Sequence, residues 1–165
     1  MTSDPRPPAD PRPPADPQPP REPRSPAGSR SPGRRLISSG GPWEAAVGYS
    51  RAVVIGDRVL VSGTTDAGAD GRSLHPGDVG AQARAAFAIV ARALAEAGAT
   101  LDDVVRTRMY VVDPGDVPAV TAVHGELFAT ARPAATLVIV AGLIDPTLRV
   151  EVEAEAVLPP AGGSG

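Results

Sequence analysis

Short β-rich stretches alternate along the chain with two stretches of helical spacing. Residues 51–55 (RAVVI) and 58–63 (RVLVSG) flank Gly56-Asp57, a two-residue spacing that favours a β-hairpin. Residues 78–97 repeat apolar side chains at helical intervals, and Asp78 and Gly98 are suited to begin and end that helix. The apolar positions are Val79, Ala83, Ala86, Val90, Leu94 and Ala97.

The second half of the chain repeats this order. Residues 104–112 (VVRTRMYVV) predict a strand, and Asp116 and Pro118 suit the start of a second helix. The buried stripe of that helix is predicted at Val117, Val120, Val123, Leu127 and Phe128. Residues 134–141 then form an apolar run, which we interpret as a buried strand.

The last strand is predicted by strict alternation over residues 148–158. Leu148, Val150, Val152, Ala154 and Ala156 occupy one face, and Arg149, Glu151, Glu153 and Glu155 occupy the other. Two interpretations of the glutamates stay open. They are either a catalytic set in a polar cavity or the solvated face of a strand.

The predicted element order is β-β-α-β-α-β-β, and the pattern allows one further short strand before Arg51. This order indicates an α+β fold, a mixed sheet with two helices packed on one face. The opposite face then needs a cover, which favours association between copies of the chain.

Residues 1–38 differ from the rest of the chain. The segment DPRPPA occurs twice, and 12 of the 20 prolines precede Leu36. Because proline removes backbone donors and few apolar side chains are present, we expect a disordered or polyproline II tail. Either it binds a proline-recognising module or it is a tolerated low-complexity extension. The folded domain is predicted at 40–158, with a flexible C-terminus at 159–165.

Composition excludes several kinds of chemistry. Cysteine and lysine are absent, which excludes disulfides, thiolate sites and Schiff bases on lysine. The two histidines, His75 and His124, are far apart in sequence, so we expect no metal site. No apolar run approaches the roughly 20 residues of a membrane span. The tail lacks the apolar core of a secretory signal, and we expect a cytoplasmic protein.

The charge balance argues against nucleic acid and membrane partners. Net charge is −3, and residues 39–165 carry nine arginines against fifteen acidic residues. Phosphate contacts need a basic surface.

Four motifs give the chain its resemblance to a known family. They are Val-Ser-Gly at 61–63, GAQAR in the first long helix, LDDVV before the following strand, and the closing Val-Glu-Val-Glu-Ala. With RPAAT at 132–136, they resemble the RidA family, also called YjgF or L-PSP, from about Gly41 to Leu158.

The resemblance implies a chorismate-mutase-like fold. It also implies a homotrimer with a ligand cleft between each pair of subunits and no metal or organic cofactor. Its best-known members hydrolyse 2-enamine and 2-imino acids to 2-keto acids and ammonia.

The resemblance also assigns roles to individual residues. Glu151 falls on the glutamate that orients a water, and Ser62, Gly63 and the backbone of Leu137 fall on the pocket lining. Ser62 has no paired base and no nucleophile elbow around it, so we expect a backbone role.

Two further positions differ from the family pattern. Trp43 replaces the tyrosine that closes the cleft, where it serves either as a lid or as an anchor for the start of the domain. Thr121 replaces a common asparagine, and His124, near it on the helix, is interpreted as a surface residue.

The main departure is at Ala135, where the family has the arginine that binds the substrate carboxylate. Ala135 and the neighbouring Thr136 cannot form that charged contact. Three arginines could replace it, namely Arg108, Arg132 and Arg149, although each is more simply a surface charge.

Three functions follow from the sequence. The first is a hydrolase of an enamine, imine or related small electrophile that uses Glu151. The second is a non-catalytic trimer that binds a small molecule or a partner protein. The third, endoribonuclease activity, ranks last because the folded part is acidic.

Overall fold

The computed structural model describes residues 33–158, so most of the predicted tail and the predicted C-terminal segment 159–165 lie outside the described residues. The strands are β1 (Arg34–Ile37), β2 (Ala52–Ile55), β3 (Arg58–Thr64), β4 (Val104–Val111), β5 (Ala134–Ile139) and β6 (Val150–Val157). The helices are α1 (Pro42–Val47), α2 (Val79–Ala97) and α3 (Val117–Leu127), with short 3₁₀ turns at Leu101–Asp103 and Pro114–Asp116.

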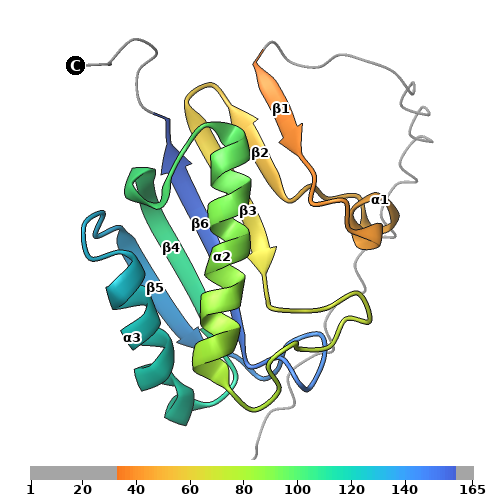
Figure 1. The fold of residues 1–165 in the computed structure, drawn as a ribbon, viewed down its shortest axis with the longest axis vertical. Helices are drawn as coiled ribbons and strands as arrows, with labels where there is room; N and C mark the ends of the chain where they lie inside the picture. The colour runs from red at the N-terminus through yellow and green to blue at the C-terminus, as the bar shows by residue number, and fades with distance from the viewer. Residues whose placement is uncertain (1–32, 159–165) are drawn as a thin grey trace, which may run out of the picture.

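The six strands form one mixed sheet in the order β1-β2-β3-β6-β4-β5. Every neighbouring pair is antiparallel except β4 and β5, which are parallel. Both long helices, α2 and α3, cover the same face of the sheet (Figure 1). This arrangement confirms the predicted α+β class.

The predicted boundary at residue 38 is wrong, because β1 lies inside the segment assigned to the tail. β1 pairs with β2 in antiparallel register, from Arg34 opposite Ile55 to Ile37 opposite Ala52. The Ile37 side chain is only 4% exposed, and the Arg35 guanidinium donates to two carbonyls at the end of α2. The buried Ile37 side chain and the hydrogen bonds of Arg35 therefore make residues 34–37 part of the fold, although the sequence analysis assigned them to the tail. β1 is also the further strand that the pattern allowed.

The capping prediction for α2 is confirmed at both ends. The Asp78 side chain accepts a hydrogen bond from the Ala81 amide at 2.9 Å. Gly98 has a φ of 92°, a left-handed conformation in which a side chain would be strained. All six predicted apolar positions of α2 are buried.

The start of α3 differs from the prediction. Asp116 occupies the N-cap position, but its side chain makes no capping hydrogen bond. Its carboxylate is instead paired with Arg149 Nε at 2.7 Å. Of the predicted stripe, Val120, Val123 and Phe128 are buried, while Val117 and Leu127 are partly exposed.

The prediction that residues 134–141 form a buried strand is also wrong in the single chain. β5 is an edge strand that pairs only with β4, and five of its six residues are exposed. Sequence pattern cannot distinguish an apolar strand that is buried within its own chain from an apolar strand that is exposed at the edge of the sheet.

Within residues 33–158, no helix has the length and hydrophobicity needed to cross a membrane.

Candidate functional site

An irregularity between β3 and β6 creates the position of Glu151. The two strands pair regularly up to Val61 opposite Ala154, and the register then shifts so that Thr64 lies opposite Val152. Ser62 and Gly63 occupy this bulge, a feature that commonly redirects a side chain beside a site.

Gly63 leaves the space that the Glu151 carboxyl group occupies. A Cβ atom on Gly63 would overlap the Glu151 Oε1 atom and would lie 3.1 Å from its carboxyl carbon. Of the twenty residues only glycine leaves this contact undisturbed, so the structure brings together two residues that the sequence analysis assigned to the site.

Glu151 is only partly accessible, and its environment favours the protonated form. Burial raises the pKa of Glu151 above its ordinary value, and the negative charge of Glu153 raises it further, while Arg51 opposes both effects. A carboxyl group with a raised pKa exchanges protons more readily near neutral pH. The carboxyl group is therefore suited to move a proton to or from a bound molecule.

Arg51, which the sequence analysis did not single out, supports the bulge from the other side. Its Nη1 atom donates to the Gly63 carbonyl at 3.0 Å and to the Thr64 hydroxyl at 2.7 Å. Its guanidinium carbon lies 5.7 Å from the ring centre of Tyr49. In sequence, Arg51 is the polar residue before a strand, so only the contact with Gly63 identifies its role.

The Ser62 hydroxyl has a structural role. It donates to the Ser50 carbonyl at 2.7 Å, and the Ser62 amide donates to the Arg51 carbonyl at 3.0 Å. These bonds tie the bulge to the start of β2. They support the expected backbone role over a nucleophilic one.

The β5 residues lie away from Glu151 within one chain. Ala135, Thr136 and Leu137 pair with Thr107, Arg108 and Met109 of β4. β4 separates β5 from β6 in the sheet, and Glu151 pairs with Tyr110. The two halves of the predicted site are thus separated in a single chain.

Trp43 and Thr121 are also not joined to Glu151 by any hydrogen bond or ion pair within residues 33–158. Trp43 lies on α1 with 55% of its surface exposed. The Thr121 hydroxyl donates to the Val117 carbonyl of its own helix at 2.8 Å. The bond of Thr121 is local, whereas Trp43 remains accessible to a ligand.

Two of the three candidate replacement arginines are engaged in ion pairs. Arg108 contacts Glu153 at 3.2 Å and Glu155 at 3.1 Å. Arg149 contacts Asp116 at 2.7 Å. A substrate carboxylate would have to compete with these acidic partners.

The third candidate, Arg132, lies at the turn that leads into β5. Its Nε atom donates to the Ala129 carbonyl at 3.3 Å, and its backbone has a φ of 44°. Arg132 is exposed and three residues before Ala135, and no contact within residues 33–158 connects it to Glu151.

The interpretation of His124 as a surface residue is wrong. Its Nε2 atom lies 2.9 Å from the Thr107 hydroxyl, and its ring lies 4.7 Å from the ring of Phe128. Burial lowers the pKa of His124, which favours the neutral ring. His124 therefore helps to fasten α3 to β4.

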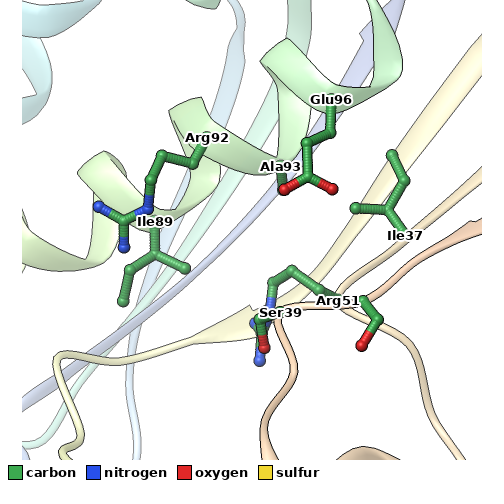
Figure 2. A pocket seen from close by; sticks show the side chains of 8 residues that line it. Ile37, Ser39, Arg51, Ile89, Arg92, Ala93 and Glu96 are labelled. Atoms are coloured by element: carbon green, nitrogen blue, oxygen red, sulfur yellow. The ribbon is translucent and has the colours of Figure 1, made fainter.

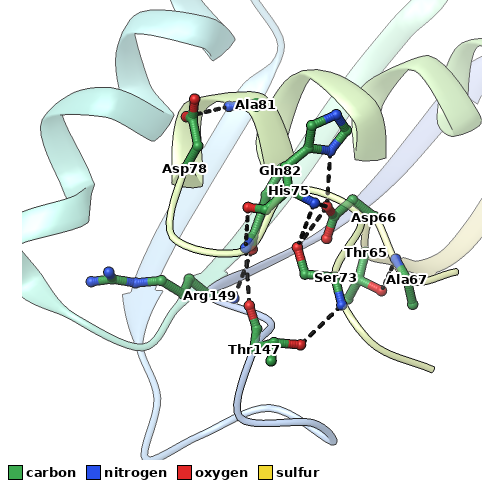
Figure 3. A network of polar contacts seen from close by, with 10 residues as sticks. All are labelled: Thr65, Asp66, Ala67, Ser73, His75, Asp78, Ala81, Gln82, Thr147 and Arg149. Carbon is green, nitrogen blue, oxygen red and sulfur yellow. Dashed lines mark hydrogen bonds and ion pairs between the residues drawn. The ribbon is translucent and has the colours of Figure 1, made fainter. Parts of the chain in front are cut away.

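His75 belongs to a polar network between the loop that follows β3 and the loop that precedes β6 (Figure 3). Its Nδ1 atom lies 3.1 Å from Oδ2 of the buried Asp66, which also accepts from the Ser73 hydroxyl at 2.8 Å. Gln82 joins this loop to the one before β6, because it donates to the His75 and Thr147 carbonyls and accepts from the Arg149 amide. The network holds the two loops together.

Across residues 33–158, no group of three or more histidine, aspartate or glutamate side chains is arranged to hold a metal ion.

Comparisons with known proteins identify relatives of this chain. The chain is 43% identical over 122 residues to an uncharacterised protein of Streptomyces coelicolor, a match that covers 74% of this chain and 90% of that protein. It is 32% identical over 108 residues to the 3-aminoacrylate deaminase RutC of Acinetobacter baylyi, covering 66% of this chain and 85% of the relative.

A solved structure shows the same fold. The crystal structure of Rv2704 from Mycobacterium tuberculosis, a member of the YjgF/YER057c/UK114 family, superposes with a TM-score of 0.69 at 47% identity. The match covers 76% of this chain and 99% of Rv2704. The sequence profile described as Endoribonuclease L-PSP matches residues 42–158. This chain therefore belongs to the L-PSP family, also known as the RidA or YjgF family.

Proposed function

We propose that this chain is a hydrolase of enamines or imines, with Glu151 as the catalytic residue. The observation that carries the proposal is the partly buried Glu151 carboxyl group, which packs on Gly63 and has a raised pKa. The relative named 3-aminoacrylate deaminase supports the same reaction class, because 3-aminoacrylate is an enamine.

The reaction needs one proton carrier and one water. The protonated Glu151 carboxyl group first gives its proton to the β-carbon of the enamine, which produces an iminium ion and leaves Glu151 as a carboxylate. Glu151 then orients a water and removes its proton as the oxygen bonds to the iminium carbon. Return of that proton to nitrogen breaks the C–N bond and releases ammonia, and the hydroxyl proton passes to the Glu151 carboxylate as the carbonyl group forms.

The substrate is proposed to lack a carboxylate next to the imine carbon or to bind it through another group. An arginine at position 135 would bind such a carboxylate with two parallel hydrogen bonds, and Ala135 offers none. A charged contact of this kind contributes about 1.5–3 kcal/mol. Its loss would weaken binding of 2-imino acids.

We further propose that three chains associate and complete each cleft. The uncovered face of the sheet carries a ladder of ion pairs among Arg58, Arg106, Arg108, Glu153 and Glu155. The apolar β5 edge is exposed beside it. Association would cover both surfaces and would bring β5 of one chain toward Glu151 of its neighbour, as the family resemblance implies.

The alternative is a non-catalytic trimer that binds a small molecule, and Ala135 is the observation that favours it. We do not propose ribonuclease activity, because the folded part carries an excess of acidic residues.

The test is an assay of the full-length chain with freshly generated 2-iminobutanoate and with a cyclic enamine that lacks a carboxylate. Ammonia release would be compared among the wild type, Glu151→Gln and Ala135→Arg. We expect turnover of the enamine, a loss of about 10²–10⁴-fold in Glu151→Gln, and a gain on 2-iminobutanoate in Ala135→Arg.

The outcomes separate the two functions. If the wild type turns over neither compound and Ala135→Arg gains no activity, the binding-protein alternative is favoured. If the wild type hydrolyses 2-iminobutanoate as fast as the variant, another group anchors the carboxylate.

A further inference from the structure

Gly63 contacts both Arg51 and Glu151. The Glu151 carboxyl group occupies the space where a Cβ atom of Gly63 would lie. Arg51 Nη1 donates to the Gly63 carbonyl at 3.0 Å and to the Thr64 hydroxyl at 2.7 Å. No ion pair or hydrogen bond within residues 33–158 joins Arg51 to Glu151, so one glycine residue separates the two groups and Arg51 acts on Glu151 through its charge.

The charge of Arg51 has no carboxylate in direct contact. Both Nη1 acceptors are neutral oxygens, and within the described part of the chain Arg51 forms no ion pair. On the helix side, Arg92 and Glu96 of α2 line a small cavity together with Arg51 (Figure 2). The charge of Arg51 also reaches Glu44, whose carboxylate two serine hydroxyls already hold. The guanidinium charge is therefore not cancelled by a bonded partner.

Three titratable or charged groups face Glu151. Tyr110 pairs with it from β4, Glu153 follows on the same face of β6, and Arg51 lies before β2. Burial and the charge of Glu153 raise the pKa of Glu151, whereas Arg51 lowers it. Burial and Glu153 also raise the pKa of Tyr110, so this phenol is uncharged near neutral pH. Arg51 is thus the group that offsets both raising effects on Glu151.

We propose that Arg51 is a positioning residue of the Glu151 site, which holds the bulge beneath the carboxyl group and sets the pH range in which Glu151 both gives and takes a proton. Without this charge, burial and Glu153 would keep the carboxyl group protonated and unable to take a proton from water. A direct ion pair would instead keep it ionised and unable to donate. The effect on turnover rests on the hydrolase function proposed above, whereas the effect on the protonation of Glu151 does not.

The first test measures Glu151 itself and needs no substrate. The side-chain carboxyl carbons of the full-length chain are titrated by 13C NMR, and Glu151→Gln identifies the Glu151 signal. In Arg51→Gln, which removes the charge but keeps an amide donor, the pKa of Glu151 should rise above the wild-type value. In Arg51→Lys, which keeps the charge, it should stay close to that value. Arg58→Gln, which removes an exposed arginine paired with Glu155, is the matched control and should leave the titration unchanged.

A second measurement uses the wild type, so it does not depend on the folding of an Arg51 variant. Arg51 Nε is buried and has no hydrogen-bond partner. Its proton should therefore exchange slowly with water and give a signal in 1H–15N spectra. Because coupling between two groups is reciprocal, this signal should shift with pH at the same midpoint as the Glu151 carboxyl carbon. That shift should be absent in Glu151→Gln.

Turnover of the enamine adds a readout that a merely structural role would not move. In Arg51→Gln the protonated carboxyl group persists to higher pH, so the alkaline limb of kcat/KM should move to higher pH. The maximum should fall by up to about 10²-fold, because the bulge is held less firmly. A residue that only stabilised the bulge would lower the rate equally at every pH.

Either of two results would overturn the proposal. One is an unchanged pKa of Glu151 in folded Arg51→Gln, and the other is a wild-type Arg51 Nε signal that does not follow the titration of Glu151. If the pKa rises in Arg51→Gln but neither protein turns over the enamine, the hydrolase function fails and the control of Glu151 by Arg51 stands.

Discussion

The bulge between β3 and β6 and the free edge of β5 are the two regions from which the candidate site is assembled, and they differ in how complete they are. At the bulge, Gly63, Arg51 and Glu151 are all positioned by contacts within one chain. At the edge, Ala135 and its neighbours have backbone partners on one side only. One chain thus positions Glu151 by its own contacts, whereas the outer edge of β5 has no backbone partner within residues 33–158.

The first prediction disrupts the bulge and has the largest expected effect. Gly63→Ala places a Cβ atom where the Glu151 Oε1 atom lies. Because a glutamate side chain is flexible, the carboxyl group should rotate away, and the fold should lose at most about 1–3 kcal/mol. We expect enamine turnover to fall to the level of Glu151→Gln, about 10²-fold or more.

Steady-state kinetics and urea unfolding of the single and double variants would check this. If Gly63→Ala acts only by displacing Glu151, then Gly63→Ala with Glu151→Gln should be no less active than either alone. A further loss in the double variant would contradict that explanation.

The second prediction disrupts the edge. Val138 of β5 is 41% exposed on the uncovered face, opposite Tyr110. Val138→Asp places a charge in the proposed interface, so light scattering after gel filtration should show a smaller species than the trimer proposed for the wild type. In the single chain such a surface change is expected to alter unfolding by only about 0.5 kcal/mol.

Val47→Asp is the matched control, because Val47 is 70% exposed but lies on α1 rather than on β5. It should leave the assembly unchanged. An unaltered trimer in Val138→Asp would show that β5 does not form the interface.

The third prediction, which has the smallest expected effect, concerns the pH dependence of the stability that Glu151 at the bulge causes. The pKa of Glu151 is raised in the folded state, chiefly by burial, so the unfolded chain releases this proton at lower pH. The ionised carboxylate therefore destabilises the fold progressively as pH rises from the ordinary glutamate pKa through the raised value. Below the ordinary value the two states bind the proton equally and no difference is expected.

Thermal melts of wild type and Glu151→Gln between pH 4 and 8 would measure this. We expect the melting temperature of Glu151→Gln to exceed that of the wild type at neutral pH, with the difference vanishing at about pH 4. A difference independent of pH would argue against a raised pKa of Glu151.

The sequence alone determined those elements whose stabilising contacts join residues close together in the chain. The alternation along β6 places Val150, Val152, Ala154 and Ala156 in the core, as predicted. α2 is capped at Asp78 and Gly98, as predicted, because its capping bonds join residues only a few positions apart. The Gly56-Asp57 turn likewise connects neighbouring strands.

The sequence pattern failed where the partner of a residue is distant in the sequence, or where the single chain supplies no partner. Asp116 was expected to cap α3, but Arg149, which is 33 positions later, takes its carboxylate. β1 was assigned to the tail because four residues carry too little pattern to predict a strand without β2 beside them. The run at 134–141 is apolar, yet this chain leaves it exposed.

The candidate site shows the same division. The sequence alone determined the family resemblance, the presence of Glu151 and Gly63, and the absence of an arginine at position 135. Only the tertiary structure decided that Arg51 reaches the Gly63 carbonyl, that Gly63 makes room for Glu151, and that β5 lies two strands away from β6. The physical reason is that helix caps and strand alternation depend on neighbours in the chain, whereas a bulge, an ion pair or a cavity depends on packing between segments far apart in sequence.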